Sequence, residues 1–155
     1  MVQTMFTIVL IEPQIPPNTG NIGRLCGATD SKLDIVGKIG FDLSDRQLKR
    51  AGLDYWEHID WHYFPHTELY MDSLVPAKIH LLTTKATASY TERQFEPGDR
   101  LIFGSETRGI DEYYRRKYRS SCCTIPMKNG NIRSLNLSTS VGIVLGEALR
   151  QNGRF

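Results

Sequence analysis

Short runs of apolar residues alternate along this chain with longer segments in which apolar residues recur every three or four positions. The short runs are typical of buried strands, which we expect at Phe6–Ile11, Leu33–Gly37, Lys78–Thr84, Arg100–Gly104 and Cys122–Pro126. The longer segments predict helices at Asn21–Thr29, Ser44–Arg50, Thr67–Leu74, Asp111–Tyr118 and Asn136–Gln151. This alternation favours an α/β fold in which helices cover a parallel sheet. The stretch Trp56–Phe64 is ambiguous, and a further strand there stays open.

Composition narrows the class of protein without naming a partner. The chain has 155 residues, 40% of them hydrophobic and 23% charged, which excludes a disordered, collagen-like or coiled-coil protein. It has neither an internal repeat nor a long linker, so we expect a single domain spanning residues 1–155. Its 19 basic and 17 acidic residues leave a net charge of only +2, so nucleic acid would have to be bound by local basic clusters.

The termini and cysteines indicate the compartment. The opening MVQTMFTIVLIEP has no basic segment, no cleavage motif and far fewer apolar residues than the ~20 that span a bilayer, so we expect a cytoplasmic protein without a membrane partner. Cys26, Cys122 and Cys123 form no C-x-x-C motif, so they predict neither disulfides nor a zinc site. We interpret Cys122 and Cys123 as inert core residues of a strand.

A histidine triplet is the one candidate for a metal site. His58, His62 and His66 recur every four residues, which would place them on one face of a helix. Pro65 interrupts that helix, and the aromatic residues between the histidines are typical of packing. We therefore expect no metal cofactor.

Two predicted helices carry glycines four residues apart. Gly23 and Gly27 lie in the first helix, and Gly142 and Gly146 lie in the last. Such pairs let another backbone approach closely, either inside the monomer or at a homodimer interface, although simple tolerance of glycine explains them equally well.

Ligands of open α/β sheets bind at the carboxyl ends of the strands, so the loops after the strands are the candidate sites. After the first strand, EPQIPPNTGNIGR leads into a helix, and its terminal amides together with Arg24 suit an anionic group. A helix cap by Asn18 or Thr19 is the simpler reading of the same residues.

The loop GSETRG follows the fourth predicted strand. Gly104 and Gly109 have the spacing of a Walker A loop, but Ile110 and Asp111 stand where its Lys and Ser or Thr are required. No G-x-G-x-x-G follows the first strand, so a Rossmann dinucleotide site is excluded. After the last strand, polar side chains precede an apolar helix in greater number than capping needs, at Arg133, Ser134, Asn136 and Ser138.

Two basic clusters are candidates for an RNA surface. Residues 113–119 alternate tyrosines with arginine and lysine, a composition that can stack on bases and neutralise phosphates. Arg46, Lys49 and Arg50 form the second cluster. Solvated helix faces have the same composition, so both readings remain open.

Taken together, the three loops resemble the three motifs of the SPOUT class of AdoMet-dependent RNA methyltransferases. The motifs read IPPNTGNIGRLC, then LTTKAT leading to LIFGSETRGI, then IPMKNGNIRSLNLSTSVGIVLGEALRQ. The likeness spans nearly the whole chain and is greatest to the minimal subfamily of tRNA wobble-nucleotide ribose 2'-O-methyltransferases, which act on cytidine or a modified uridine. It departs from the usual pattern at Gly23, Ser105, Thr139 and Gly146.

The resemblance implies a C-terminal deep trefoil knot, a homodimer and S-adenosyl-L-methionine as methyl donor. It places the donor's adenine against main-chain groups at Leu82, Gly104, Ile125 and Ser134. It places Arg24 opposite the substrate ribose, with Asn136 and Ser138 as the polar pair of the third motif. The substrate it implies is a tRNA anticodon stem-loop, because no RNA-binding domain is appended.

The implied reaction is an in-line displacement that needs alignment and exclusion of water more than acid–base chemistry. Arg24 stays protonated, so we interpret it as a hydroxyl or phosphate positioner and leave the general base open. Two alternatives remain: a ribosomal RNA 2'-O-methyltransferase of the same class, and a noncatalytic nucleotide- or RNA-binding module.

Overall fold

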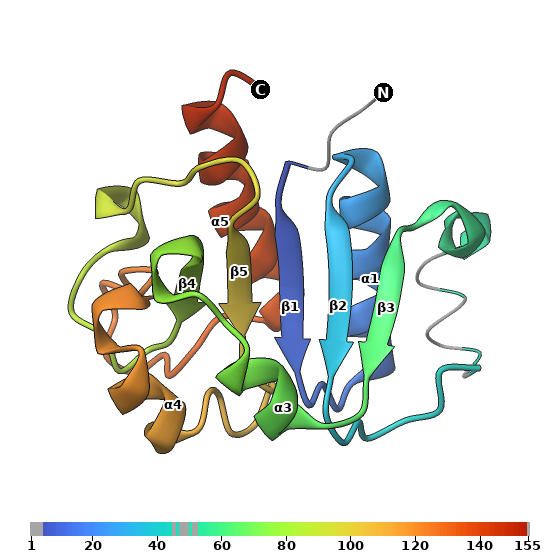
Figure 1. Cartoon of the computed structure of the whole chain (residues 1–155), viewed down its shortest axis with the longest axis horizontal. Coiled ribbons are helices and arrows are strands. Elements are labelled where there is room, and N and C mark those ends of the chain that lie inside the picture. The colour runs from blue at the N-terminus through green and yellow to red at the C-terminus, as the bar shows by residue number, and fades with distance from the viewer. Residues whose placement is uncertain (1–4, 45, 47–49, 51–52, 155) are drawn as a thin grey trace.

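The computed structural model of the chain describes residues 5–44, 46, 50 and 53–154. Its six strands form one parallel sheet in the order β3-β2-β1-β5-β4-β6 (Figure 1). Their bounds are β1 (Thr7–Ile11), β2 (Lys32–Val36), β3 (Trp61–Phe64), β4 (Ile79–Leu82), β5 (Arg100–Phe103) and β6 (Cys122–Cys123). All five predicted strands are confirmed, and the ambiguous stretch supplies edge strand β3.

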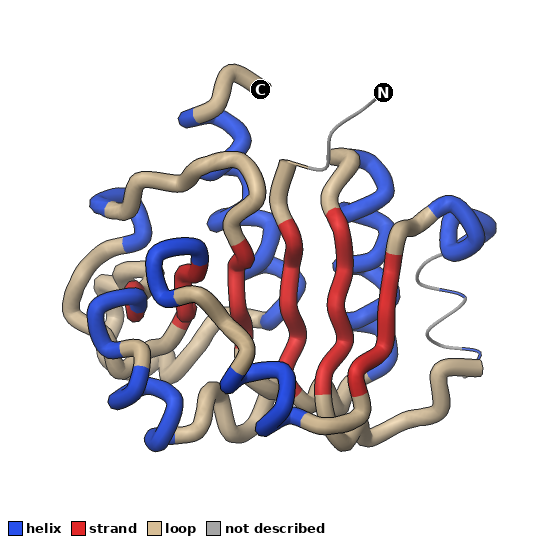
Figure 2. Tube along the Cα trace, viewed as in Figure 1, coloured by secondary structure: helices blue, strands red, loops and turns tan. Residues whose placement is uncertain are grey.

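Helices occupy the connections between strands (Figure 2). The α-helices are α1 (Pro16–Ala28), α3 (Thr67–Asp72), α4 (Glu112–Lys117) and α5 (Leu137–Gln151). Short 3₁₀ turns are η1 (Leu53–His58), η2 (Pro76–Lys78), η3 (Tyr90–Glu92) and η4 (Arg119–Ser121). The predicted helix at Ser44–Arg50 lies largely outside the described residues. Across the described ranges, no helix has the length and apolar character needed to cross a bilayer.

The central strands of the sheet are buried on both faces, because helices cover each of them (Figure 1). Along β1, Ile8 and Leu10 join the apolar cluster under α1 and α5, whereas Val9 and Ile11 join the cluster under α3 and α4. Each side chain that is fully removed from water contributes about 1.5–3 kcal/mol. This explains why the central strands are continuous apolar runs without alternation of polar residues.

The connection between β4 and β5, residues 83–99, runs along the outer side of β6, and we call it the strap. Thr83 N–H donates to the Cys123 carbonyl (2.9 Å) from the end of β4. On the other side, Thr124 N–H donates to Ala88 O and Tyr90 N–H donates to Thr124 O, both at 2.8 Å. The segment 122–124 therefore lies between β4 and the strap.

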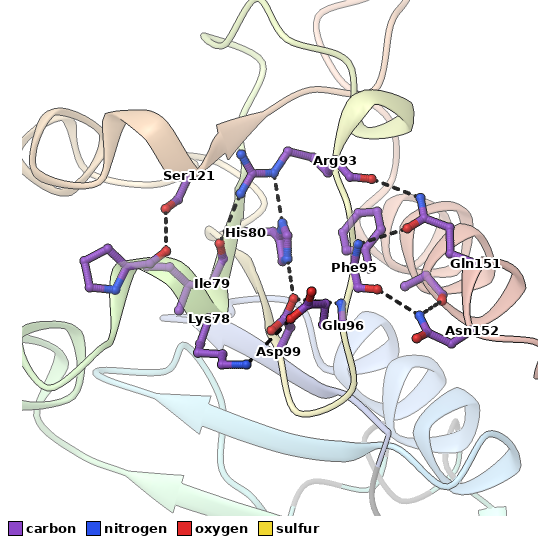
Figure 3. A network of polar contacts seen from close by, with 12 residues as sticks. Lys78, Ile79, His80, Arg93, Phe95, Glu96, Asp99, Ser121, Gln151 and Asn152 are labelled. Atoms are coloured by element: carbon purple, nitrogen blue, oxygen red, sulfur yellow. Dashed lines mark hydrogen bonds and ion pairs between the residues drawn. The ribbon is translucent and has the colours of Figure 1, made fainter.

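A buried polar cluster, here called the strap network, fastens the strap to the amino ends of β4 and β5 (Figure 3). Arg93 Nε donates to His80 Nδ1 (2.9 Å), and His80 Nε2 lies 2.8 Å from Asp99 Oδ2. Because the guanidinium can only donate, Nδ1 is the acceptor, so Nε2 carries the proton and donates to Asp99. Burial lowers the pKa of His80, which favours this neutral form.

The end of α5 completes the strap network (Figure 3). Gln151 accepts from Phe95 N–H (2.9 Å) and donates to Arg93 O (3.0 Å). Asn152, the C-cap of α5, donates to Phe95 O (2.9 Å). The last helix thus holds the strap against the sheet.

Candidate functional site

A cavity with a volume of about 1060 Å³ lies at the carboxyl ends of β4, β5 and β6. It is walled by the loops after these strands, by the start of α5 and by Ile15 and Asn18 after β1. β1 sits between β2 and β5, where the order of strands along the sheet reverses direction. Such a switch point is the place where open α/β sheets bind ligands.

The structure brings five of the seven predicted site residues together in this cavity. The five line it from three loops and the α5 cap: Leu82, Gly104, Ile125, Ser134 and Asn136. Ser138 is not part of the lining, but its hydroxyl lies 2.5 Å from Asn136 Oδ1. Arg24 is exposed and lies outside the lining, with its guanidinium carbon 5.4 Å from the centre of the Tyr55 ring.

Glu106, from the loop after β5, occupies the amino-terminal end of α1. Its two carboxylate oxygens accept from the backbone N–H groups of Gln14 and Ile15, both at 2.9 Å. Hydrogen bonds from backbone amides to a charged carboxylate are stronger than those between neutral groups. Glu106 therefore ties the loop after β5 to the backbone that leads into α1.

Helix α1 begins at Pro16, five residues before the predicted start at Asn21. Its N-cap residue Ile15 has no side-chain cap, and Asn18 and Thr19 lie inside the helix, so the predicted cap at these two residues is wrong. The helix begins earlier because Pro16 and Pro17, which lack N–H groups, fit its first two positions. Glu106, from a loop more than 90 residues away, binds the two backbone amides just before them.

Asn18 links the first and third motifs. Its amide donates to Glu106 (3.2 Å), and its carbonyl oxygen accepts from the Asn136 amide (3.0 Å). Asn136 in turn caps α5 by accepting from the Ser138 and Thr139 N–H groups at 2.9 and 3.3 Å. We call Glu106, Asn18 and Asn136 the site network, and it fixes the starts of α1 and α5 relative to the β5 loop.

The turn after β5 is closed by its two glycines. A Cβ on Gly104 would lie only 2.0 Å from the Gly109 carbonyl carbon, so no larger residue fits there. Gly109 has φ +67°, a conformation that L side chains rarely adopt. Gly109 N–H donates to Ser105 O (3.0 Å), so the turn keeps its backbone fixed along the cavity wall.

The tyrosine-rich basic cluster is only partly an exposed surface. Tyr114 and Tyr118 are buried under the sheet and cannot stack on bases. Arg116 pairs with Glu112 (2.8 Å) and Lys117 pairs with Asp72 (2.7 Å). The prediction of an interleaved stacking surface is therefore wrong for these two rings, because the helix turns them into the core. Of the second basic cluster, Lys49 lies outside the described residues.

The histidine triplet does not share a helix face. His58 ends η1, His62 lies in β3 beside Asp60 (3.0 Å), and His66 precedes α3. Over the part of the chain that is described, no three His, Cys, Asp or Glu side chains are grouped to hold a metal ion.

The cysteines are free thiols in apolar surroundings. Cys26 and Cys123 are buried, and Cys122 is half-buried. Burial raises the pKa of Cys123 to about 12 and also raises that of Cys122, which disfavours their reactive thiolate forms. The predicted place of the pair in a strand is confirmed, although only Cys123 is fully buried.

The two glycine pairs differ. A Cβ on Gly23 would lie 2.5 Å from the Trp56 ring, and one on Gly27 would lie 3.3 Å from Ile59, so the first pair packs against residues around η1. A Cβ on Gly142 would meet nothing within 4 Å. The first pair therefore serves packing within the chain, and the face of α5 around Gly142 is open.

Sequence reasoning missed two features of the cavity. It did not pair Glu106 with α1, and it did not single out Lys85 or Ile132, which both line the cavity. The available signal was their position in loops that follow neighbouring strands, because such loops meet at one edge of the sheet.

Comparison with known proteins places the chain in a family. A family model described as the SpoU rRNA Methylase family matches residues 5–146. The tRNA (cytidine(34)-2'-O)-methyltransferase of Burkholderia pseudomallei is 43% identical over 156 residues, covering 96% of this chain and 97% of that protein.

Two solved structures are also similar. One, described as "Structural insights into the 2-OH methylation of C/U34 on tRNA", has a TM-score of 0.90 at 36% identity and covers 97% of both chains. The methyltransferase AviRb of Streptomyces viridochromogenes, in complex with AdoMet, shares the fold with a TM-score of 0.83 at 22% identity, covering all of this chain and 63% of its own. With a family match over most of its length, this chain belongs to the SpoU methylase family.

Proposed function

We propose that this protein transfers a methyl group from S-adenosyl-L-methionine to the ribose 2'-hydroxyl of the wobble nucleotide, cytidine or a modified uridine, in tRNA. The observation that carries the proposal is the single cavity formed where all three motif loops meet. Full-length similarity to an enzyme named for cytidine 34 of tRNA supports the substrate. The neighbouring structure of C/U34 methylation supports it as well.

The cavity fits an adenosine-containing donor. Its walls combine apolar side chains, such as Leu82, Ile125 and Leu135, with the backbone of tight loops. An adenine ring needs apolar faces and a few amide partners at its polar edge, which fixed main chain provides. The donor's sulfonium, when bound, supplies an already activated methyl group.

The residues of the chain then have to align the ribose and exclude water. The site network holds Asn136 at the cavity wall by its bonds to Asn18 and to the α5 amides. Glu106 is poorly suited to act as general base, because both of its oxygens accept from backbone amides. Its role is to fix the loops relative to one another.

Arg24 is proposed to position the ribose hydroxyl or a phosphate of the RNA. It is exposed and lies outside the cavity of its own chain, so it would meet the substrate only beyond the cavity lining. We expect Arg24→Ala to abolish methyl transfer while the affinity for AdoMet changes little. An equal loss of methyl transfer and of AdoMet affinity would contradict this role.

We also propose that the chain is threaded as a C-terminal trefoil knot within a single domain spanning residues 1–155. The support is that segment 122–124 lies between β4 and the strap, which together with β5 form a loop around it. The chain approaches this segment from α4 on one face and leaves it toward α5 on the other. Few proteins are threaded in this way.

A homodimer is proposed from the open face of α5. Because Gly142 faces no neighbour in its own chain, a second copy can approach the helix backbone there. Gly142→Tyr should then shift the sedimentation profile toward monomer, and an unchanged profile would contradict the interface. The tRNA substrate makes a cytoplasmic location the expected one.

The proposed function is tested by methyl transfer from labelled AdoMet. Purified protein is incubated with total tRNA and with ribosomal RNA, and the methylated nucleotide is mapped by mass spectrometry. Methylation at the wobble ribose of tRNA is the expected result. Transfer to ribosomal RNA would favour the alternative substrate, and AdoMet binding without transfer would indicate a noncatalytic module.

A further inference from the structure

The cavity carries a strong excess of positive charge for a chain of net charge +2. Among the described residues that line it, four are basic (Lys85, Arg108, Arg115 and Arg133) and only Glu106 is acidic. Both oxygens of the Glu106 carboxylate accept from the backbone N–H groups of Gln14 and Ile15, so it does not face the cations as an ion-pair partner. The lining is therefore positive.

Three of these cations come from three different loops. Lys85 follows β4, Arg108 follows β5 and Arg133 follows β6, and all three side chains are exposed. Within the described chain the side-chain nitrogens of these three residues form neither an ion pair nor a hydrogen bond, unlike those of Arg116, Lys117 and Arg150. Arg115 differs, because it is half-buried and its Nε donates to Ile110 O (3.1 Å). We call Lys85, Arg108 and Arg133 the cationic rim.

A methyl donor alone does not account for such a rim. S-adenosyl-L-methionine has a sulfonium, an ammonium and a carboxylate, so it is itself a cation, and like charges repel. A strand of RNA carries one negative charge per nucleotide and is the natural partner of unpaired arginine and lysine.

We infer that the cationic rim binds the backbone phosphates next to the target nucleotide, so that the nucleotide enters the cavity between them. Ile15 and Ile132, which also line the cavity and are 42% and 51% exposed, offer apolar contact to the base. This inference rests on the proposed function and assigns RNA contact to the rim instead of to α4.

The test measures binding of a fluorescent anticodon stem-loop RNA by full-length protein over a range of salt concentrations. The variants are Lys85→Gln, Arg108→Gln, Arg133→Gln and the triple variant, with Arg116→Gln on α4 as the matched control. For single-stranded contacts, each lost phosphate reduces the slope of log K against log salt by about 0.7, so the triple variant should lose about 2. Arg116→Gln should keep the wild-type slope.

AdoMet affinity, measured by calorimetry, shows whether the cationic rim binds RNA phosphates or the carboxylate of the methyl donor. For RNA phosphates, the triple variant binds AdoMet as tightly as wild type or somewhat more tightly. A parallel loss of AdoMet affinity would assign the rim to the donor's carboxylate and overturn the inference. Unchanged salt slopes, or an equal effect of Arg116→Gln, would overturn it too.

Melting temperatures show whether each variant is folded, and every substitution lies at an exposed position. Wild-type methylation of the wobble ribose, mapped in the same RNA, tests the proposed function separately. If that methylation is present while the rim variants keep full salt dependence, only the rim assignment fails.

Discussion

Two polar networks lie at opposite ends of the sheet, and they differ in what they hold. The strap network at the amino ends is buried and joins a neutral histidine to Asp99 and Arg93. The site network at the carboxyl ends is centred on the partly exposed Glu106 and joins the starts of two helices. The α5 helix connects them, since Asn136 caps its start and Asn152 caps its end. The first network should govern stability, and the second should govern catalysis.

Glu106→Gln should produce the largest effect. It keeps the shape of the side chain but removes the charge and one of the two acceptor oxygens that hold Gln14 and Ile15. Hydrogen bonds to a charged group are worth about 1.5–3 kcal/mol, and several are weakened together, so kcat should fall by about 100-fold or more. Single-turnover methyl transfer at saturating AdoMet measures this loss.

The control for this variant is Glu112→Gln, an exposed carboxylate on α4. It should keep the wild-type rate. If Glu106→Gln were as active as wild type, the site network would not position the reacting groups.

Among these variants, His80→Ala should cause the largest loss in the free energy of unfolding. It leaves the buried Asp99 and the side chain of Arg93 without their shared partner and removes the contact with the Phe95 ring, whose centre is 4.5 Å away. Since an unsatisfied buried polar group costs about 1–3 kcal/mol, the free energy of unfolding should fall by roughly 2–4 kcal/mol. Urea denaturation measures the change.

His62→Ala, on edge strand β3, is the matched control and should alter stability by less than about 0.5 kcal/mol. If folded His80→Ala protein lost methyl transfer as completely as Glu106→Gln does, the strap network would not act on stability alone.

Gln151→Ala tests the contact of α5 with the strap. It removes the bonds to Phe95 N–H and Arg93 O, each worth about 0.5–1.5 kcal/mol, so a loss of about 1–2 kcal/mol is expected. The neighbouring Arg150→Ala removes the ion pair of an exposed arginine with Glu147 but no contact with the strap, so it should have a smaller effect in the same thermal melts. Equal effects of the two would mean that α5 does not hold the strap.

The free energy of unfolding should fall as the pH is lowered, because the strap network needs neutral His80. Burial lowers the pKa of His80 below its ordinary 6.5, so the unfolded chain takes up a proton at higher pH than the folded protein does. The stability contributed by neutral His80 is present above pH 6.5 and is lost as the pH falls through the pKa of the folded state. Unfolding at a series of pH values should show this slope in wild type and a smaller slope in His80→Ala.

The fold could be predicted where the information is local. Buried strands appear as apolar runs, and α4 and α5 begin at Asp111 and Asn136, whose side chains cap them. The start of α1 was predicted five residues too late, and the contact of Glu106 with the backbone before it could not be predicted because the two segments are distant in sequence. β3 was ambiguous because it is an edge strand with exposed aromatic residues.

The candidate site was also predictable only where local sequence carries the information. The family resemblance singled out Gly104, Ile125 and Ser134 in loops that follow predicted strands, and these loops do meet in one cavity. The orientation of α4 could not be read from its composition, so Tyr114 and Tyr118 looked like an RNA surface although they belong to the core. Arg24 has the right motif position, yet the cavity of its own chain does not include it.

The positive lining of the cavity has a consequence for the order of events. The positively charged methyl donor is repelled by the positively charged lining of the cavity. Binding of the polyanionic RNA to the cationic rim reduces this repulsion. Thermodynamic linkage makes this relief mutual, so donor and tRNA should each tighten the binding of the other. Methyl transfer then removes the donor's sulfonium charge, and with it the attraction that held the two ligands together.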